Sequence, residues 1–106
     1  MTFPQRSVDR CPFCKIELGD SERAWVTRGR GVSAFINPRQ YERGAMLVIT
    51  HAHRESVLDL TDDELLEAHT LARELARAAA TALDAGGALI YQRNGMVSGQ
   101  NVPHYH

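Results

Sequence analysis

The sequence lacks the features that mark membrane, secreted or nucleic-acid-binding proteins. Its 106 residues carry a net charge of −1, so no basic excess is present to neutralise a nucleic-acid backbone. The longest strongly apolar run, residues 45–49, is far shorter than the ~20 residues that a spanning helix needs. Residues 1–10 form a polar segment without the apolar region of a secretory signal. We therefore expect one domain over 11–106, cytoplasmic by default, that binds neither nucleic acid nor membranes.

Cysteine is equally scarce, because the chain has only Cys11 and Cys14, in the order Cys-Pro-Phe-Cys. Two cysteines cannot form a disulfide framework, and in a reducing compartment such a pair is typical of a metal site or a redox centre. Thiolates bind zinc well, and the two-residue spacer lets both reach one tetrahedral ion. The other ligands of a closed, structural Cys2His2 site must then come from the five histidines: His51, His53, His69, His104 and His106.

The same cysteine pair also fits a redox motif of the glutaredoxin type. Asn101-Val102-Pro103 is even similar to the cis-proline segment of that fold. However, a redox motif of this kind follows a complete buried strand, whereas only ten polar-rich residues precede Cys11. The proline also lies too far along the chain for that layout. A metal site is therefore the preferred interpretation, and a glutaredoxin-like redox protein is the less favoured one.

Glycine and proline divide the rest of the chain into short elements. A helix is expected over 62–84, because Thr61 and Glu64 form a capping box and a glycine pair ends it. The apolar stripe that should face a sheet consists of Leu65, His69, Ala72, Leu75, Ala79 and Leu83. Strands are expected over 23–27, 32–36, 45–50, 88–93 and 101–106, after a tight turn at the cysteines. This order predicts an α+β fold, a largely antiparallel five-stranded sheet with one long helix packed on it.

His104 and His106 stand two residues apart on the last predicted strand, so both side chains point to one face. They end the stretch Gly-Gln-Asn-Val-Pro-His-Tyr-His, which resembles the approach to the His-φ-His-φ-His motif of the histidine-triad (HIT) superfamily. Segment 44–53 is similar to the family's Gly-His-x-Leu-Val-Ile-Pro-x-x-His, and the cysteine pair resembles that of its zinc-containing bacterial members. The resemblance covers 11–106, and it implies a HIT-like fold and a homodimer.

The resemblance also implies a role for each residue that matches a family position. The second triad histidine, His106, would be the nucleophile. The ligands of a structural zinc ion would be Cys11, Cys14, His53 and His104. Asn37 would contact the ribose and Phe35 and Ile36 would border the base, while the polar positions around the phosphate would be Asn94, Gln100 and Asn101.

Three positions depart from the family pattern. The third triad histidine and the rest of the last strand would lie beyond His106, where the sequence stops. Ala45 replaces a common histidine, and Asn101 stands where serine or threonine is usual. We interpret the sequence as a truncated form rather than a degenerate member, because everything upstream keeps the pattern.

The chemistry that the resemblance implies suits these residues. Attack at an α-phosphate needs a nucleophile that is neutral near pH 7, and imidazole, with a pKa of ~6.5, meets that need. A histidine that binds zinc cannot attack, so His104 and His106 must divide the two roles. The expected activity is nucleotidyl transfer or hydrolysis on nucleoside phosphoramidates or dinucleoside polyphosphates, through a covalent nucleotidyl-histidine. The alternative is a nucleotide-binding HIT module without turnover.

Overall fold

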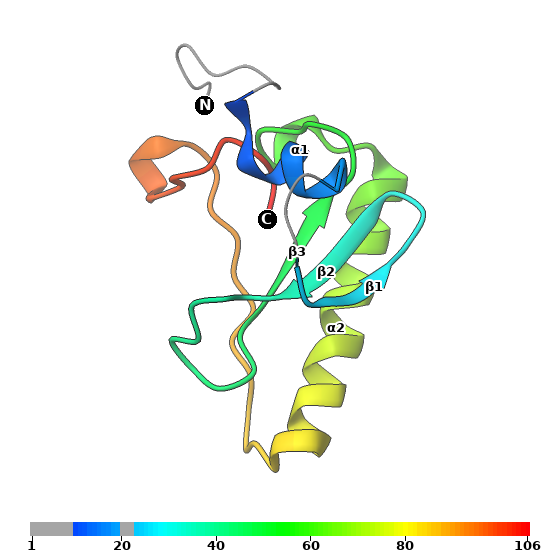
Figure 1. Cartoon of the computed structure of the whole chain (residues 1–106), viewed down its shortest axis with the longest axis vertical. Helices are drawn as coiled ribbons and strands as arrows, with labels where there is room; N and C mark the ends of the chain where they lie inside the picture. Colours follow the sequence, from blue (N-terminus) through cyan, green and yellow to red (C-terminus); the bar gives the residue numbers. More distant parts are fainter. Residues whose placement is uncertain (1–9, 20–22) are drawn as a thin grey trace.

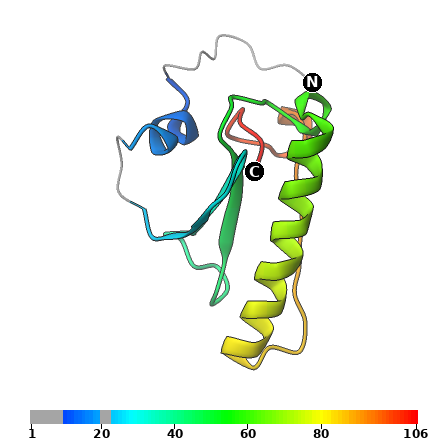
Figure 2. The same ribbon diagram turned by 90° about the vertical axis from the view of Figure 1, so that its right-hand side faces the viewer.

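The computed structural model describes residues 10–19 and 23–106, so the expected polar segment 1–10 lies outside it except for Arg10. A sheet lies between a short and a long helix (Figures 1 and 2). The elements are α1 (Pro12–Glu17), β1 (Trp25–Arg28), β2 (Val32–Ile36), β3 (Met46–Thr50) and α2 (Asp62–Leu83). Two 3-10 turns, Val57–Asp59 and Met96–Ser98, flank α2 in the sequence.

The three strands form the antiparallel meander that their short connections predict, in the order β1-β2-β3. Their register is anchored by Phe35, which stands opposite Trp25 on one side and Leu47 on the other. Side chains alternate between the two faces of a strand. Phe35 and Ile49 accordingly pack toward α1, whereas Val32 and Val48 pack toward α2. The sheet therefore separates two small cores, one under each helix.

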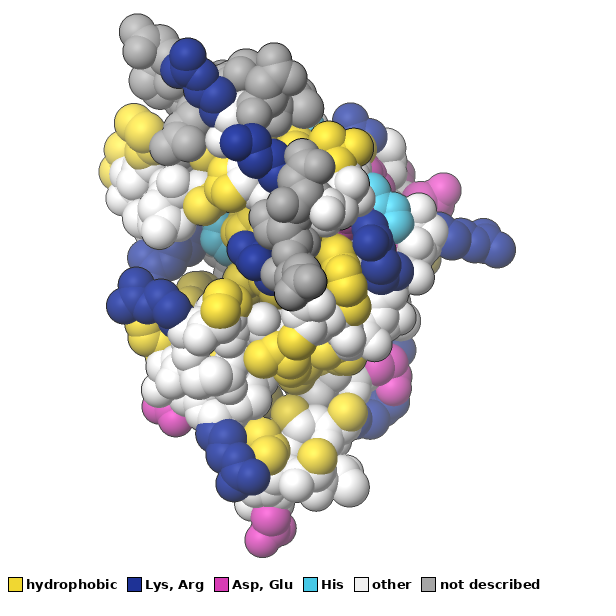
Figure 3. Space-filling model, viewed as in Figure 1, with side chains coloured by type: hydrophobic (Ala, Val, Ile, Leu, Met, Phe, Trp, Pro, Cys, Tyr) yellow, Lys and Arg dark blue, Asp and Glu magenta, His cyan; other side chains and the backbone are white. Residues whose placement is uncertain are grey.

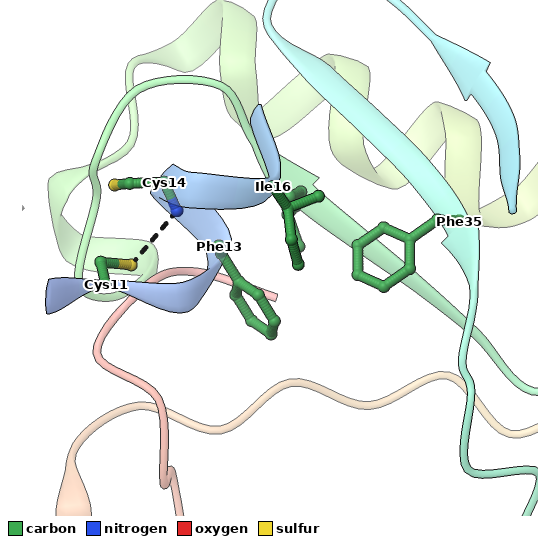
Figure 4. Close-up of a cluster of buried hydrophobic side chains, with 6 residues drawn as sticks. Cys11, Phe13, Cys14, Ile16 and Phe35 are labelled. Atoms are coloured by element: carbon green, nitrogen blue, oxygen red, sulfur yellow. Dashed lines mark hydrogen bonds between the residues drawn. The ribbon is translucent and has the colours of Figure 1, made fainter. Parts of the chain in front are cut away.

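A short helix, α1, replaces the tight turn that was expected at the cysteines. Cys11 is its N-cap, and its sulfur accepts a hydrogen bond from the Cys14 N–H at 3.4 Å (Figure 4). Pro12 occupies the first turn, where a missing N–H costs nothing. Because the spacing of the cysteines equals nearly one helical turn, the motif brings both side chains to one end of α1.

The capping box predicted for α2 is confirmed by hydrogen bonds in both directions between Thr61 and Glu64. The helix ends at Leu83, one residue earlier than expected. Asp84 adopts the left-handed conformation at the C-cap (φ 50°) without requiring a glycine. Figure 2 shows the full length of α2 lying along one side of the sheet.

The predicted buried stripe of α2 was wrong at its first two positions, whereas Ala72, Leu75, Ala79 and Leu83 are half-buried, as expected. Leu65 is 37% exposed and His69 is exposed, whereas Glu64 and Ala68 are the buried residues. The cause is Glu64, whose carboxylate accepts from Arg54 Nε at 3.0 Å and closes the capping box. These polar contacts turn the start of the helix so that a charged residue faces inward.

The expected five-stranded sheet was also wrong in number, because the described residues form three strands. Residues 88–93 and 101–106 are not assigned to strands. A strand needs a partner whose N–H and C=O groups meet its own. A groove separates 88–93 from β3, so its alternating apolar pattern gives an extended chain without a hydrogen-bonded ladder.

Candidate metal centre and adjacent histidine

Two cysteine and two histidine side chains converge at one end of the sheet. Cys11 Sγ lies 3.3 Å from His104 Nδ1, and Cys14 Sγ lies 3.1 Å from His53 Nδ1 and 3.5 Å from His104 Nδ1. The four candidate ligand atoms all lie within 4.8 Å of one another. The structure thus brings together the four residues that the family resemblance implies as zinc ligands. The two cysteines come from the start of α1, His53 from the loop after β3, and His104 from the last residues of the sequence.

This arrangement fits zinc in both distance and chemistry. With Zn–S bonds of about 2.3 Å and Zn–N bonds of about 2.1 Å, tetrahedral geometry places sulfur and nitrogen ligands roughly 3.6 Å apart. The observed sulfur–nitrogen separations of 3.1–3.5 Å need only a small expansion to reach that value. Among the described residues this is the cluster suited to a metal ion, and two thiolates with two imidazoles are a donor set that zinc prefers.

His104 is oriented for this role by the last residue of β3. Its Nε2–H donates to the Thr50 carbonyl at 2.7 Å, so the lone pair is left on Nδ1, the atom that faces both sulfurs. A hydrogen bond to the second ring nitrogen is the usual way in which proteins fix a metal-binding histidine. The side chain is fully buried, and this burial lowers the pKa of His104 to about 4. Its ring is therefore neutral at pH 7, the form that binds metal.

The cysteine sulfurs lie in an environment that disfavours free thiolates. Burial, with further contributions from the neighbouring Cys11 and Glu17, raises the pKa of Cys14 to about 12. A cation bound between the sulfurs would reverse this preference, because zinc binding displaces the thiol proton. The site is thus suited to hold sulfur as a metal ligand, and poorly suited to present a reactive thiolate of the glutaredoxin kind.

His106 lies beside the metal cluster but does not belong to it. Its Nδ1–H donates to the His104 carbonyl at 2.8 Å, which leaves the lone pair on Nε2. Burial lowers the pKa of His106 below its ordinary value, so the ring is neutral at pH 7. One histidine thus faces the metal cluster, and the other, two residues later on this bent segment, remains free for chemistry.

His106 also lines a groove of about 1240 Å³ between the outer edge of β3, one face of α2 and the extended segment 85–93. Alanine side chains of α2 make up much of the wall, so the groove is wide and mostly apolar. Figure 3 shows hydrophobic side chains lying open on this side of the molecule. The volume is large enough for a nucleotide-sized ligand.

The candidate substrate residues fall into two groups. Asn37, Asn101 and His106 line the same groove. By contrast, Gln100 is 3% exposed, and its side-chain amide bonds the backbone of Glu55, Gly95 and Val102. The predicted phosphate contacts stay predictions, and the observed hydrogen bonds make Gln100 a residue that fixes the loop.

The other residues predicted to contact the substrate also include some that are engaged within the protein and one that is exposed. The Asn94 side-chain oxygen accepts from the Val57 N–H at 2.8 Å, so it joins the loop after β3 to residues 94–100. Phe35 is 1% exposed and packs in the core under α1, whereas Ile36 at the strand end is 36% exposed. The predicted contact of Asn94 with the phosphate and those of Phe35 and Ile36 with the base stay predictions.

Two supporting residues carry no sequence signal of their own. Phe13, between the cysteines, packs its ring edge-on against His106, with ring centres 5.0 Å apart. Arg54 bonds Glu64 through its side chain, and its carbonyl accepts from the Tyr105 N–H, so α2 helps to place the histidine segment. Only spacing relative to the cysteine and histidine motifs could have pointed to them.

The fold is a small α+β domain, built from an antiparallel meander and one long helix. Its site is a zinc-type Cys2His2 cluster that lies next to a free histidine, the candidate nucleophile. Residues 20–106 match the HIT domain family. "Protein hit" of Bacillus subtilis is 35% identical over 99 residues, covering 93% of this chain and 68% of that protein. The chain belongs to the HIT domain family, whose members are typically nucleotide hydrolases or transferases.

Solved structures agree with this assignment. A HIT family protein from Bacillus anthracis superposes with a TM-score of 0.87 at 30% identity, over 92% of this chain and 70% of that one. A zinc-bound histidine triad family protein from Mycobacterium smegmatis gives a TM-score of 0.86 at 27% identity, over 94% and 73%. No helix in the described part of the chain is long and apolar enough to cross a membrane.

Proposed function

We propose that the protein is a nucleotidyl hydrolase or transferase that cleaves a bond at the α-phosphate of a nucleoside phosphoramidate or dinucleoside polyphosphate. The observation that carries this proposal is the 2.8 Å hydrogen bond from His106 Nδ1 to the His104 carbonyl, at a residue that lines the groove. The bond commits the ring proton to Nδ1 and leaves Nε2 as the nucleophilic atom. In-line attack on phosphorus requires such a neutral, oriented nitrogen.

Each step then has a defined path for bonds and protons. The Nε2 lone pair of His106 attacks the α-phosphorus, the bond to the amine or phosphate leaving group breaks, and that group takes a proton from solvent water as it departs. The resulting imidazolium keeps its Nδ1–H on the His104 carbonyl, which stabilises the positive charge. Water, or another acceptor in a transfer reaction, then attacks phosphorus and restores the free ring.

The metal would act on structure and not on the substrate. Cys11, Cys14, His53 and His104 would hold zinc with four protein ligands, which leaves no position for a substrate oxygen. When bound, zinc supplies a cross-link between α1, the end of β3 and the end of the chain. The two buried free thiols also support our placement of the protein in a reducing compartment, the cytoplasm.

We also propose that two copies assemble through the exposed apolar segment that follows α2. Leu89, Ile90 and Tyr91 are consecutive and are 83%, 59% and 66% exposed. Exposed apolar surface of this kind is typical of a protein interface. A monomer in analytical ultracentrifugation at micromolar concentration would contradict the dimer.

The test of the activity follows release of nucleoside monophosphate from adenosine 5′-phosphoramidate by the zinc-loaded protein. We expect His106→Ala to reduce turnover by at least ~10³-fold, because it removes the nucleophile. His51→Ala is the matched control, since His51 bonds Ser33 and does not line the groove. Rapid acid-free quenching followed by mass spectrometry should find one nucleoside monophosphate attached to His106. Turnover that survives in His106→Ala would exclude this mechanism.

A nucleotide-binding module without turnover is the second candidate. The hydrogen bonds within the loop favour it, because the Gln100 amide is engaged with backbone groups and is not free to stabilise a phosphate. Calorimetric binding of adenosine monophosphate without any release from the phosphoramidate would support this candidate over the enzyme.

A further inference from the structure

One aromatic ring touches both functional parts of the site. Phe13 stands between Cys11 and Cys14 on α1, and its ring meets that of His104 at 5.7 Å and that of His106 at 5.0 Å. Both contacts are edge-to-face, with interplanar angles of 83° and 79°. Figure 4 shows the ring extending from α1 toward the last residues of the chain.

The hydrogen bond of His106 does not orient its ring completely. A single bond from Nδ1 to the His104 carbonyl is a weak restraint, because a turn of the imidazole about its Cβ–Cγ bond breaks it and lets the ring proton move to Nε2. Such a turn would swing Nε2 away from the line of attack. The edge-to-face contact with Phe13 sets the plane of the ring, because aromatic pairs prefer this geometry and the Phe13 ring is itself buried.

We propose that Phe13 is a positioning residue that orients the His106 imidazole and makes this orientation depend on the metal-binding turn. The inference rests on the proposed function for the role of His106. Phe13 acts through His106 and takes no part in bond making. Together, the hydrogen bond and the ring contact define the direction of Nε2, which neither could do alone.

The dependence on the metal-binding turn follows from how Phe13 is held. The helix α1 has only six residues, too few to be stable without tertiary contacts. On one side its cysteines join the metal cluster. On the other side the Phe13 ring rests edge-on against Phe35, with ring centres 6.3 Å apart. Loss of the cluster would free α1 and, with it, the surface against which His106 packs.

The experiment compares three substitutions at Phe13 with one at Ile16. Phe13→Tyr keeps the ring, Phe13→Leu keeps apolar bulk without the ring, and Phe13→Ala keeps neither. Ile16→Ala is the matched control, because Ile16 lies on the same helix and in the same core, 1% exposed, but makes no ring contact with either histidine. Zinc content and unfolding curves are measured for each variant.

Two measurements distinguish the positioning of His106 by Phe13 from a general loosening of α1. Long-range ¹H–¹⁵N spectra of the histidine rings report whether His106 keeps its proton on Nδ1, independently of any turnover. Kinetics report whether kcat falls while the dissociation constant for adenosine monophosphate stays the same. In Phe13→Ala we expect one zinc per chain, a mixture of His106 tautomers and kcat lower by on the order of ten-fold. Phe13→Tyr should restore both readouts, and Phe13→Leu should restore neither fully.

Several results would overturn the proposal. One is a single Nδ1–H tautomer with unchanged kcat in Phe13→Ala. Others are loss of zinc from that variant, or the same tautomer mixture in Ile16→Ala, since either would assign the effect to a loosened α1. If the unmodified protein turned over no nucleotide, the proposed function would fail, and the tautomer measurement would still decide the role of Phe13.

Discussion

The two ends of the long axis of the molecule are held together in different ways. At the metal end, buried ligands and side chain–backbone hydrogen bonds tie α1, β3 and residues 94–106 to one another. At the other end, the last turns of α2 and residues 84–93 leave apolar side chains open to solvent (Figure 3). The chain thus fixes its chemical site by internal contacts, whereas the segment that follows α2 keeps apolar side chains exposed.

Removal of a metal ligand should have the largest effect on stability, because it loosens the metal end. Cys11→Ser should abolish tight zinc binding and lower the free energy of unfolding by ~4 kcal/mol, because metal affinity contributes directly to folding. Zinc content by atomic emission and urea unfolding provide the measurement. A variant that kept stoichiometric zinc would show that the four-ligand cluster is not the metal site.

Acid should weaken the metal end in the zinc-free protein. The folded-state pKa of His104, about 4, lies below its ordinary value of 6.5, so the unfolded chain takes up a proton first as the pH falls. Stability from this group is therefore complete above pH 6.5 and lost between pH 6.5 and 4, on the order of 3 kcal/mol. Urea unfolding with a chelator at several pH values measures the slope. His104→Gln should reduce the slope, and an unchanged slope in that variant would assign it to other groups.

Matched charge removals on α2 compare the shielded ion pair at the metal end with an exposed ion pair farther along the helix. Glu64, with its side chain 11% exposed, pairs with Arg54, whereas Glu74, 51% exposed, pairs with Arg77. Glu64→Gln should cost ~1–2 kcal/mol, since it weakens a capping box and a shielded pair. Glu74→Gln should cost at most ~0.5 kcal/mol, because an exposed pair contributes little. If denaturant titration gave equal losses of stability for the two variants, burial would not distinguish the two ion pairs.

The smallest effect on stability should come from the exposed extended segment. Ile90→Ser should change the free energy of unfolding, extrapolated to low protein concentration, by less than ~0.5 kcal/mol, because the side chain is 59% exposed. The same substitution should weaken self-association in sedimentation equilibrium. A large loss of stability without any change in association would mean that the segment packs within its own chain.

The structure could be predicted from the sequence where a motif allows only one local geometry. The cysteine spacing indicated a metal site, and the resemblance to the HIT superfamily then implied the four residues that the structure brings together. The helix from Asp62 was predictable because its capping box is local, needing only Thr61 and Glu64. The meander followed from short connections, which leave antiparallel pairing as the simple choice.

The errors share a physical origin in contacts between distant residues. Alternation along 88–93 predicted a strand, but a ladder depends on a partner that local pattern cannot supply. The inward face of α2 was misplaced at its first two positions because Arg54, distant from the apolar stripe, draws Glu64 inward. The Gln100 side chain donates a hydrogen bond to the Glu55 carbonyl, 45 positions away in the sequence, and no local sequence pattern predicts this contact.

The position of His104 has a consequence for how this domain tolerates change in length. Its imidazole faces the cysteines while its carbonyl receives the proton of His106, so one residue serves both neighbours. A single residue inserted between the two histidines would move His106 away from that carbonyl and so break the orientation of the nucleophile. Gly86 and Gly87, where an added Cβ would meet nothing within 4 Å, offer the opposite case. Insertions for tags or fused domains should therefore be accepted at the glycine pair and rejected at the histidines.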